Sequence, residues 1–240
     1  MFKAFVQYPH AGRLVSPAQT AADGLNLLGY EVVWFKSFEE INVTRDTLVV
    51  GFIDTYRNAI ASLGIIPPEN IDIPVELEPF TGRRIWETTL AYARNESHWP
   101  VFIKPLKHHK EFPGKIINRF RDLLTSSTLP QDFPVLASEV VKFVSEYRCF
   151  MWKHEIMSVR HYKGNPLVFP DPKRIQTMAD AWITAPVACC IDVGVIDSGE
   201  TLLVEVNDGH SMGDYGLRSL VYARMLEARW CELTGASPIP

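Results

Sequence analysis

The first third of the chain switches repeatedly between strand-like and helix-like patterns of apolar residues. Three runs rich in valine, isoleucine and aromatic residues predict strands, at residues 2–8, 31–36 and 47–53. Ser16 and Pro17 form an N-cap and first-turn pair, so a helix is expected to begin there, and a second helix is expected over residues 58–63. Because helices separate the strands, we expect a small α/β unit with parallel strand pairing.

The proline-rich segment 67–79 is typical of an extended connector and predicts a domain boundary near residue 78. Beyond it, apolar residues at helical spacing predict helices over residues 83–94, 116–124, 173–184 and 217–233. Alternating and continuous apolar runs predict strands over residues 101–105, 134–139, 146–152, 156–162, 191–196 and 202–206. The chain is therefore expected to contain a first domain over 1–78 and a larger one over 79–240.

Oxygen-bearing side chains gather on the hairpin predicted from residues 191–206. Asp192 lies on its first strand, and Glu205 and Asn207 share a face at the end of the second because they are two residues apart. A buried, unpaired carboxylate costs several kcal/mol, so these groups need a donor or a cation, and hard oxygen ligands suit Mg²⁺. A surface hairpin with solvated acids would produce the same spacing.

Basic residues also occur at unfavourable positions. Arg83 and Arg84 fall at the first turn of a predicted helix, where the dipole disfavours cations unless an anion is near. Lys104 lies within a short apolar strand, so its ammonium must reach solvent or meet an anion. Bound phosphate would explain all three residues, although arginines that simply point into solvent would explain the pair equally.

A predicted β-meander places charged residues at alternate positions of one sheet face. Glu146 and Arg148 share a face of the strand 146–152, and Arg160 lies on the next strand. A solvated sheet face is the alternative explanation. The loop that follows Lys104 is locally basic, and His108 and His109 within it are interpreted as solvated rather than as metal ligands, because adjacent side chains diverge.

Composition narrows the class of protein. With 240 residues and 47% hydrophobic content, the chain is typical of a globular protein, and its net charge of −4 argues against a general nucleic-acid or anionic-membrane surface. The sequence has no apolar run near 18 residues and no signal-peptide pattern, so a soluble cytoplasmic protein is expected. Its four cysteines lack zinc-type or CxxC spacing, which favours buried free thiols.

The order of these motifs resembles the ATP-grasp family, most nearly the ATP-grasp half of ribosomal-protein glutamate ligases and more distantly D-alanine ligases. The likeness covers residues 80–216 and rests on VFIKP at 101–105, the loop 106–115, SEVVKFVSEYR at 138–148, and Asp192 followed by EVN at 205–207. It implies an α/β (α+β) ATP-grasp fold after a small N-terminal α/β domain. Within 79–240 it implies a lid subdomain over about 98–143 and a metal-binding core over about 144–240.

The resemblance also implies roles for individual residues toward ATP and Mg²⁺. Lys104 and Arg84 would contact nucleotide phosphates, and Glu146 the ribose hydroxyls. Glu139 would begin the adenine hinge, formed by the backbone of Val140 and Val141. Arg148 and Arg160 would face the transferred phosphate or an acyl-phosphate. The Mg²⁺ ligands would be Asp192, Glu205 and Asn207.

The implied function is an ATP-dependent ligase that joins a carboxylate to an amine or similar nucleophile through an acyl-phosphate. A peptide or protein acceptor is favoured, and substrate is expected near four residues beyond the metal motif: Asp208, His210, Asp214 and Tyr215. His210 is either a base or a satisfied loop histidine. Two departures from the family are the Arg83–Arg84 pair in place of a lysine and a covering loop with Gly114 as its one glycine. The alternative is a non-catalytic module that binds nucleotide or a partner.

Overall fold

The computed structural model describes residues 2–8, 17–106 and 111–238, and it divides into two compact units. Unit 1 combines Met1–Phe80 with Val144–Pro240, and unit 2 is Thr81–Phe143. The residues expected as an N-terminal domain, 1–78, therefore share a compact unit with residues 144–240. The expected lid, about 98–143, falls inside unit 2, which begins earlier in the chain.

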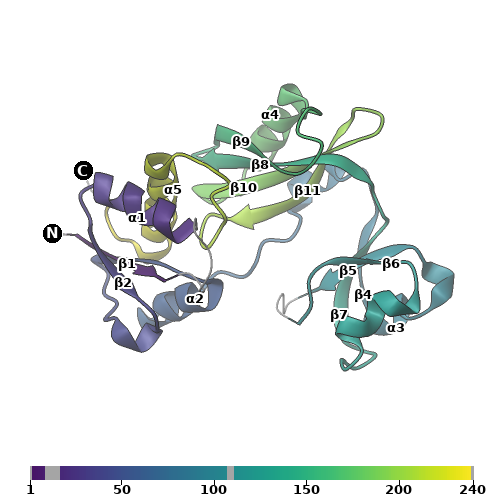
Figure 1. Ribbon diagram of the computed structural model, residues 1–240, viewed down its shortest axis with the longest axis horizontal. Coiled ribbons are helices and arrows are strands. Elements are labelled where there is room, and N and C mark those ends of the chain that lie inside the picture. Colours follow the sequence, from purple (N-terminus) through teal and green to yellow (C-terminus); the bar gives the residue numbers. More distant parts are fainter. Residues whose placement is uncertain (1, 9–16, 107–110, 239–240) are drawn as a thin grey trace. The chain divides into compact units, whose positions relative to one another are not determined.

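One part of unit 1 is a three-stranded sheet of order β2-β1-β3, with every pair parallel as predicted. Helices α1 and α5 pack against each other beside this sheet (Figure 1). Helix α5 ends at Gly235, whose φ of 70° is the left-handed conformation that a helix C-terminus favours. The bounds are β1 Lys3–Gln7, α1 Pro17–Leu27, β2 Glu31–Phe35, β3 Thr47–Val50, α2 Ile53–Ser62 and α5 Ser219–Thr234.

The other part of unit 1 is a four-stranded sheet of order β11-β10-β8-β9. Its strands are β8 Phe143–Trp152, β9 Glu155–Gly164, β10 Ala188–Ile196 and β11 Thr201–Asp208. Helix α4, Pro172–Ala181, covers one face, where Cys149, Ile191 and Leu203 belong to one buried apolar cluster (Figure 1). On the opposite face Phe150 and Cys190 join the apolar core shared with α1 and α5. The sheet is thus apolar on one face and only partly apolar on the other.

Unit 2 contains a four-stranded sheet of order β4-β7-β5-β6, whose pairs are all antiparallel. Val101, Ile103 and Ala137 pack into its apolar core. Its elements are β4 Ile85–Thr89, α3 Leu90–Ala93, β5 Val101–Pro105, β6 Lys115–Ile117 and β7 Pro134–Ser138. Short 3₁₀ turns complete the two units: η1 Phe38–Glu40, η2 Val75–Phe80, η3 Glu96–His98 and η4 Phe120–Ser126.

Two helix predictions in unit 2 are wrong. Most of the segment 83–94 is strand β4, with only the four-residue helix α3 after it, and 116–124 divides between β6 and η4. In both places an apolar run at mixed spacing pairs with a strand that is distant in sequence. The argument that placed Arg83 and Arg84 at a helix N-terminus therefore fails, because both residues precede a strand.

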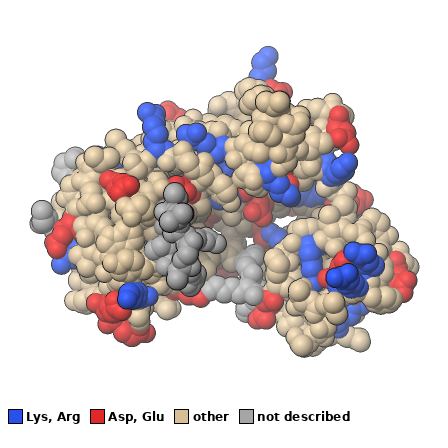
Figure 2. All heavy atoms as spheres, in the orientation of Figure 1, with Lys and Arg blue, Asp and Glu red and all other residues tan. Residues whose placement is uncertain are grey.

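The cysteine prediction is confirmed, since all four are free thiols and three of them are buried. Burial raises the pKa of the remaining one, Cys231, to about 11. Of the helices in residues 2–8, 17–106 and 111–238, none has the length and apolar character needed to cross a membrane. Charges of both signs are mixed on the visible faces of the two units (Figure 2).

The contact between α1 and α5 depends on a glycine. A Cβ at Gly24 would lie 2.0 Å from the Ser219 carbonyl oxygen and 2.7 Å from the Ala223 Cβ. We expect Gly24→Ala to destabilise the protein by about 1–3 kcal/mol, because the helices must move apart. Asn26→Ala, on the exposed side of α1, should change stability by less than about 0.5 kcal/mol. Urea unfolding measures both, and equal stabilities would contradict the proposed packing constraint.

Candidate functional site

The partly apolar face of the β11-β10-β8-β9 sheet carries a row of charged residues. Glu146, Arg148 and Phe150 alternate along β8 and share this face, and Cys190 and Asp192 share it on β10. Phe150 and Cys190 are covered by the apolar core of α1 and α5. The charged positions follow next to this core, so charged side chains are held at the border of a dry apolar layer.

A buried ion pair between Arg148 and Asp192 forms the centre of this row. Arg148 Nε donates to Asp192 Oδ1 at 2.8 Å, and Nη2 donates to Oδ2 at 2.7 Å. The side chains are only 9% and 2% exposed, so neither charge is compensated mainly by water. Such a two-pronged contact is the strongest form of arginine–carboxylate bond and fixes both side chains.

Burial is the largest influence on the Asp192 carboxyl and raises its pKa, against the opposing effect of the Arg148 guanidinium. The acids Glu205 and Glu146 raise the Asp192 pKa further. Burial alone would lower the Arg148 pKa, but its bonds to Asp192 outweigh burial and raise that pKa. The site therefore holds an excess of acid around one firmly charged arginine.

Glu205 and Asn207 join Asp192 as the hairpin pattern predicted. Asp192 pairs directly with Glu205 across β10 and β11, and Cys190 pairs with Asn207. Asn207 Nδ2 donates to Asp192 Oδ2 at 3.2 Å and to Glu205 Oε1 at 3.4 Å. Two carboxylates and one amide from two strands are thus within hydrogen-bond reach of one another.

Glu146, two residues before Arg148, is also buried and fully bonded. Tyr162 Oη donates to Glu146 Oε2 at 3.0 Å, and Lys163 Nζ donates to Oε1. Burial, followed by the nearby Asp192 and Glu146 carboxylates, raises the Tyr162 pKa. Tyr162 and Lys163 were not predicted as site residues, although Tyr162 follows Arg160 by two positions and that alternation was a usable signal.

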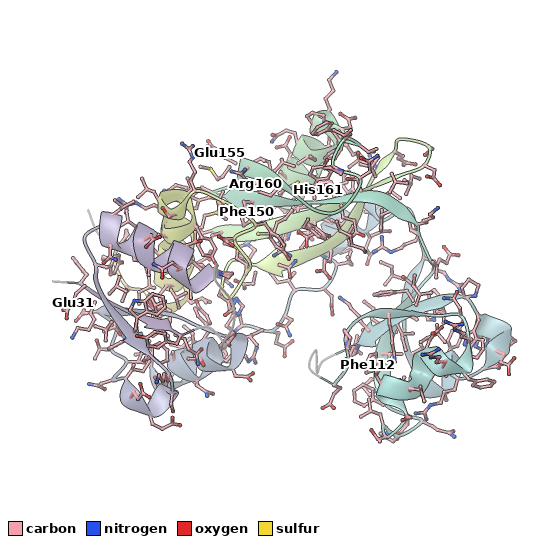
Figure 3. The ribbon with its side chains drawn as sticks, in the orientation of Figure 1. Glu31, Phe112, Phe150, Glu155, Arg160 and His161 are labelled. Atoms are coloured by element: carbon pink, nitrogen blue, oxygen red, sulfur yellow. The ribbon has the colours of Figure 1, made fainter. Side chains whose placement is uncertain are left out.

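Arg160 lies opposite Arg148 in the β8–β9 ladder, at the edge strand of the sheet (Figure 3). Two like charges in directly opposed positions repel each other. The Arg160 Nε is buried and has no hydrogen-bond partner among the described residues. A buried donor of this kind is costly unless it meets an acceptor, so the position favours an anion.

Tyr215, beyond the end of β11, completes the surroundings of Arg148. The Arg148 guanidinium carbon lies 4.9 Å from the centroid of the Tyr215 ring. The centroids of the Tyr215 and Tyr162 rings are 5.5 Å apart. Sequence reasoning placed Tyr215 in a substrate region, but nothing in the sequence indicated that its ring covers Arg148.

The predicted phosphate-binding residues and the start of the predicted hinge lie in unit 2. Lys104 is on the half-buried face of β5, opposite to the face of Val101 and Ile103. Arg84 and Glu139 meet where β4 and β7 end: Arg84 N donates to Glu139 Oε2 at 2.9 Å, and Glu139 N donates to Arg84 O at 3.1 Å. The Arg84 guanidinium lies 4.4 Å from the centroid of the Trp86 ring.

The predicted hinge and covering loop are described in part. Val140 and Val141 lie between β7 and β8, and their backbone groups have no hydrogen-bond partner in the described chain. Residues 107–110 of the basic loop, with both histidines, lie outside the described residues. Lys115 is part of β6, and its Nζ donates to Thr125 Oγ1 at 2.7 Å and to Ser126 Oγ at 3.1 Å, which gives it a structural role.

Asp208 and His210 are buried within unit 1, which corrects the expectation that they lie in an open substrate region. Arg229 of α5 donates to both Asp208 oxygens, at 2.7 and 2.5 Å, and also to Glu232 at 2.6 Å. His210 Nδ1 lies 3.0 Å from Asp208 Oδ1, and its side chain is 3% exposed. Despite burial, the bonds from His210 and Arg229 hold the Asp208 pKa well below its ordinary value.

Comparison with known families decides the identity of this arrangement. Residues 80–225, more than half of the chain, match the family model of an ATP-grasp domain, the second family of its clade. The chain belongs to the ATP-grasp family. No curated protein matches it significantly in sequence.

Solved structures with the ATP-grasp fold align with nearly the whole chain. D-alanine–D-alanine ligase from Bacillus anthracis matches with a TM-score of 0.59 at 15% identity, over 97% of this chain and 96% of that one. A RimK domain ATP-grasp protein from Sphaerobacter thermophilus matches at 0.56 and 14%, over 95% and 97%. The ATP-grasp ligase PsnB, solved with a minimal precursor, matches at 0.56 and 13%, over 95% and 99%. At these identities the likeness concerns the fold.

The oxygen-bearing cluster of this ATP-grasp chain suits Mg²⁺ in its donor chemistry. Mg²⁺ takes one or two carboxylates and completes its shell with phosphate and water, rather than using a cage of protein ligands alone. Asp192, Glu205 and Asn207 provide such a partial set. In agreement, residues 2–8, 17–106 and 111–238 contain no group of three or more His, Cys, Asp or Glu side chains arranged to hold a metal.

Removal of Arg148 should be far more damaging than removal of the whole ion pair. We expect Arg148→Leu to destabilise the ATP-grasp chain by about 3–5 kcal/mol, because Asp192 would be left buried without its main partner. The double variant Arg148→Leu/Asp192→Leu should lose less, since no uncompensated carboxylate remains. Urea unfolding followed by circular dichroism provides the double-mutant cycle, and strict additivity of the single losses would contradict the coupling.

The Asp208 network predicts a dependence of stability on pH. A carboxyl whose folded pKa lies below its unfolded value stabilises the fold above the unfolded pKa, about 4, and loses that contribution as the pH falls toward the folded pKa. The free energy of unfolding should therefore fall below about pH 4 in the wild type and fall less steeply in Asp208→Asn. Asp197→Asn, at an exposed turn position, should retain the wild-type slope. Unfolding curves across this range would contradict the assignment if Asp208→Asn kept that slope.

Proposed function

We propose that this ATP-grasp protein is an ATP-dependent ligase that activates a carboxylate as an acyl-phosphate and transfers it to an amine or similar nucleophile. The observation that supports the proposal most directly is the shared sheet face of the acids and arginines. Asp192, Glu205 and Asn207 lie beside Arg148, and Arg160 is opposite Arg148 on the neighbouring strand. Phosphoryl transfer needs both kinds of group, since a metal and cations neutralise the same phosphate charge.

Asp192, Glu205 and Asn207 are the residues that we assign to Mg²⁺. When bound, Mg²⁺ supplies positive charge to the phosphate oxygens as the γ-phosphoryl group leaves. Asn207 now donates its amide nitrogen to both acids, so it must turn its amide oxygen toward a metal to act as a ligand. Asp192 must likewise share or release its bonds with Arg148.

Arg148 and Arg160 are assigned to the transferred phosphoryl group. Two of the Arg148 donors, Nε and Nη2, are engaged with Asp192, and the buried Arg160 Nε has no described partner. An anion accepting from both guanidinium groups would relieve the repulsion between them and satisfy that donor. Their part in the reaction is to orient and stabilise charge, not to form covalent bonds.

Nucleotide-binding roles are proposed for residues of each unit separately. In unit 2, Lys104 and Arg84 are assigned to phosphate oxygens, and the unpaired backbone of Val140 and Val141 is suited to the adenine edge, with Glu139 before it. In unit 1, Glu146 is assigned to the ribose hydroxyls. Lys163, whose side chain is 69% exposed, can release one Glu146 oxygen for this purpose.

In the first step of the proposed reaction, a substrate carboxylate oxygen attacks the γ-phosphorus and ADP leaves. In the second, the amine attacks the acyl carbon, inorganic phosphate leaves with the C–O bond electrons, and the amine loses a proton. We favour a peptide or protein as acceptor, supported by the similar fold of PsnB, which was solved with its precursor. No protein nucleophile is needed.

Ligand-dependent thermal unfolding tests the proposal. We expect the midpoint of the wild-type protein to rise by roughly 2–4 °C with Mg²⁺ and ATP together at about 100 times the dissociation constant. Each component alone should give a smaller shift, since metal and phosphate share ligands. Glu205→Gln should remove the joint shift without unfolding the chain, because the hairpin stays intact while one carboxylate charge is lost.

The matched control is Glu200→Gln, an exposed acid in the turn of the same hairpin, which should keep the wild-type shift. A shift that survives Glu205→Gln would contradict the metal assignment. No shift at millimolar nucleotide would contradict the ligase proposal altogether. Binding without release of ADP in the presence of any amine or peptide would favour a non-catalytic nucleotide-binding module.

A further inference from the structure

Tyr215 makes two ring contacts that tie the arginine of the site to its acids. Its ring covers Arg148 at 4.9 Å and lies 5.5 Å from the Tyr162 ring, and Tyr162 donates to Glu146. The remaining surface of the residue is open, since 44% of Tyr215 is exposed. A large exposed aromatic ring gains little from burial here, so its contact with the guanidinium is the feature that needs explanation.

The backbone around Tyr215 is anchored on both sides. Ser211 Oγ donates to the Gly51 carbonyl at 2.9 Å, and Tyr222 Oη donates to the Met212 carbonyl at 2.5 Å. Thr20 Oγ1 donates to Asp214 Oδ2 at 2.6 Å. The segment 211–216 is therefore attached to three separate elements of unit 1, which restricts where the Tyr215 ring can lie.

Tyr215 also has an unusual backbone conformation. Its φ is 42°, in the left-handed region that non-glycine residues rarely adopt. A Cβ at Gly213 would lie 3.1 Å from Tyr215 Cε2, so the absence of a side chain at Gly213 leaves room for the ring. Local structure thus accepts an unfavourable conformation that directs this ring onto Arg148.

We propose that Tyr215 is a positioning residue, whose ring face holds the Arg148 guanidinium in the plane required to bind the phosphoryl group that the reaction transfers. This rests on the proposed function. An aromatic face attracts a guanidinium without occupying its N–H donors, so Arg148 stays fixed even when a ligand takes over its bonds to Asp192. Loss of the ring would leave those donors present but poorly oriented.

This role predicts a selective loss of affinity. Arg148 is assigned to the transferred phosphoryl group, which ATP carries and ADP lacks. We expect Tyr215→Leu to weaken binding of the magnesium complex of the non-hydrolysable β,γ-imido analogue of ATP by about 5- to 30-fold. Binding of Mg²⁺–ADP should change by less than about twofold, because ADP does not reach this arginine in the proposed arrangement.

Isothermal titration of the full chain measures both affinities, with circular dichroism to check folding. Tyr215→Phe should bind like the wild type, since it keeps the ring. Tyr8→Leu is the matched control, because Tyr8 is 47% exposed, contacts the ring of Trp34 and lies away from the charged face. Gly213→Ala, which displaces the ring without removing it, should give an intermediate loss and serves if Tyr215→Leu does not fold.

The outcomes separate the two levels of inference. A wild-type protein that binds neither nucleotide overturns the proposed function, and this inference with it. A wild type that binds both, with unchanged triphosphate affinity in Tyr215→Leu and Gly213→Ala, overturns only the role of Tyr215. Equal weakening for ADP and the triphosphate analogue would make Tyr215 a structural residue. A loss in Tyr215→Phe equal to that in Tyr215→Leu would assign the effect to the hydroxyl, against the ring contact proposed.

Discussion

The charged face of unit 1 depends on the bidentate contact between Arg148 and Asp192. Both side chains are buried at the border of an apolar core, where an unpaired charge would be very costly. The contact is possible because the sheet order sets β8 beside β10, so an arginine and an aspartate from distant parts of the sequence meet. Asn207 and Tyr215 then attach to the pair, one to the carboxylate and one to the guanidinium.

The same pair limits what a ligand must supply. A cation alone would have to compete with Arg148 for Asp192, and an anion alone would have to compete with Asp192 for Arg148. A ligand that brings a cation and an anion together compensates both partners at once, so it faces a smaller loss of existing bonds. Magnesium phosphate is such a combination, and the pair therefore favours joint over separate binding.

How far the sequence could predict this structure depends on the range of the contacts. The hairpin of β10 and β11 was predictable because its alternation and turn are local, and Asp192 does pair with Glu205. The segment 83–94 was not, since its helical spacing is overridden by pairing between β4 and β7, about fifty residues apart. Thus the oxygen ligands were found with the correct register, while the surroundings of Arg83 and Arg84 were wrong.

The partners of the site residues lay beyond sequence reasoning for the same reason. Asp208 and His210 follow the EVN motif directly, so proximity in sequence indicated a substrate region. In the structure Asp208 belongs to Arg229, one turn before the end of α5, and the two form a buried contact of the same two-pronged kind as Arg148 and Asp192. One strand end thus lies between two ion pairs: Asn207 bonds to the acid of the first, and the next residue is the acid of the second. The change from site to scaffold therefore occurs between adjacent residues, a boundary that only the positions of β8 and α5 define.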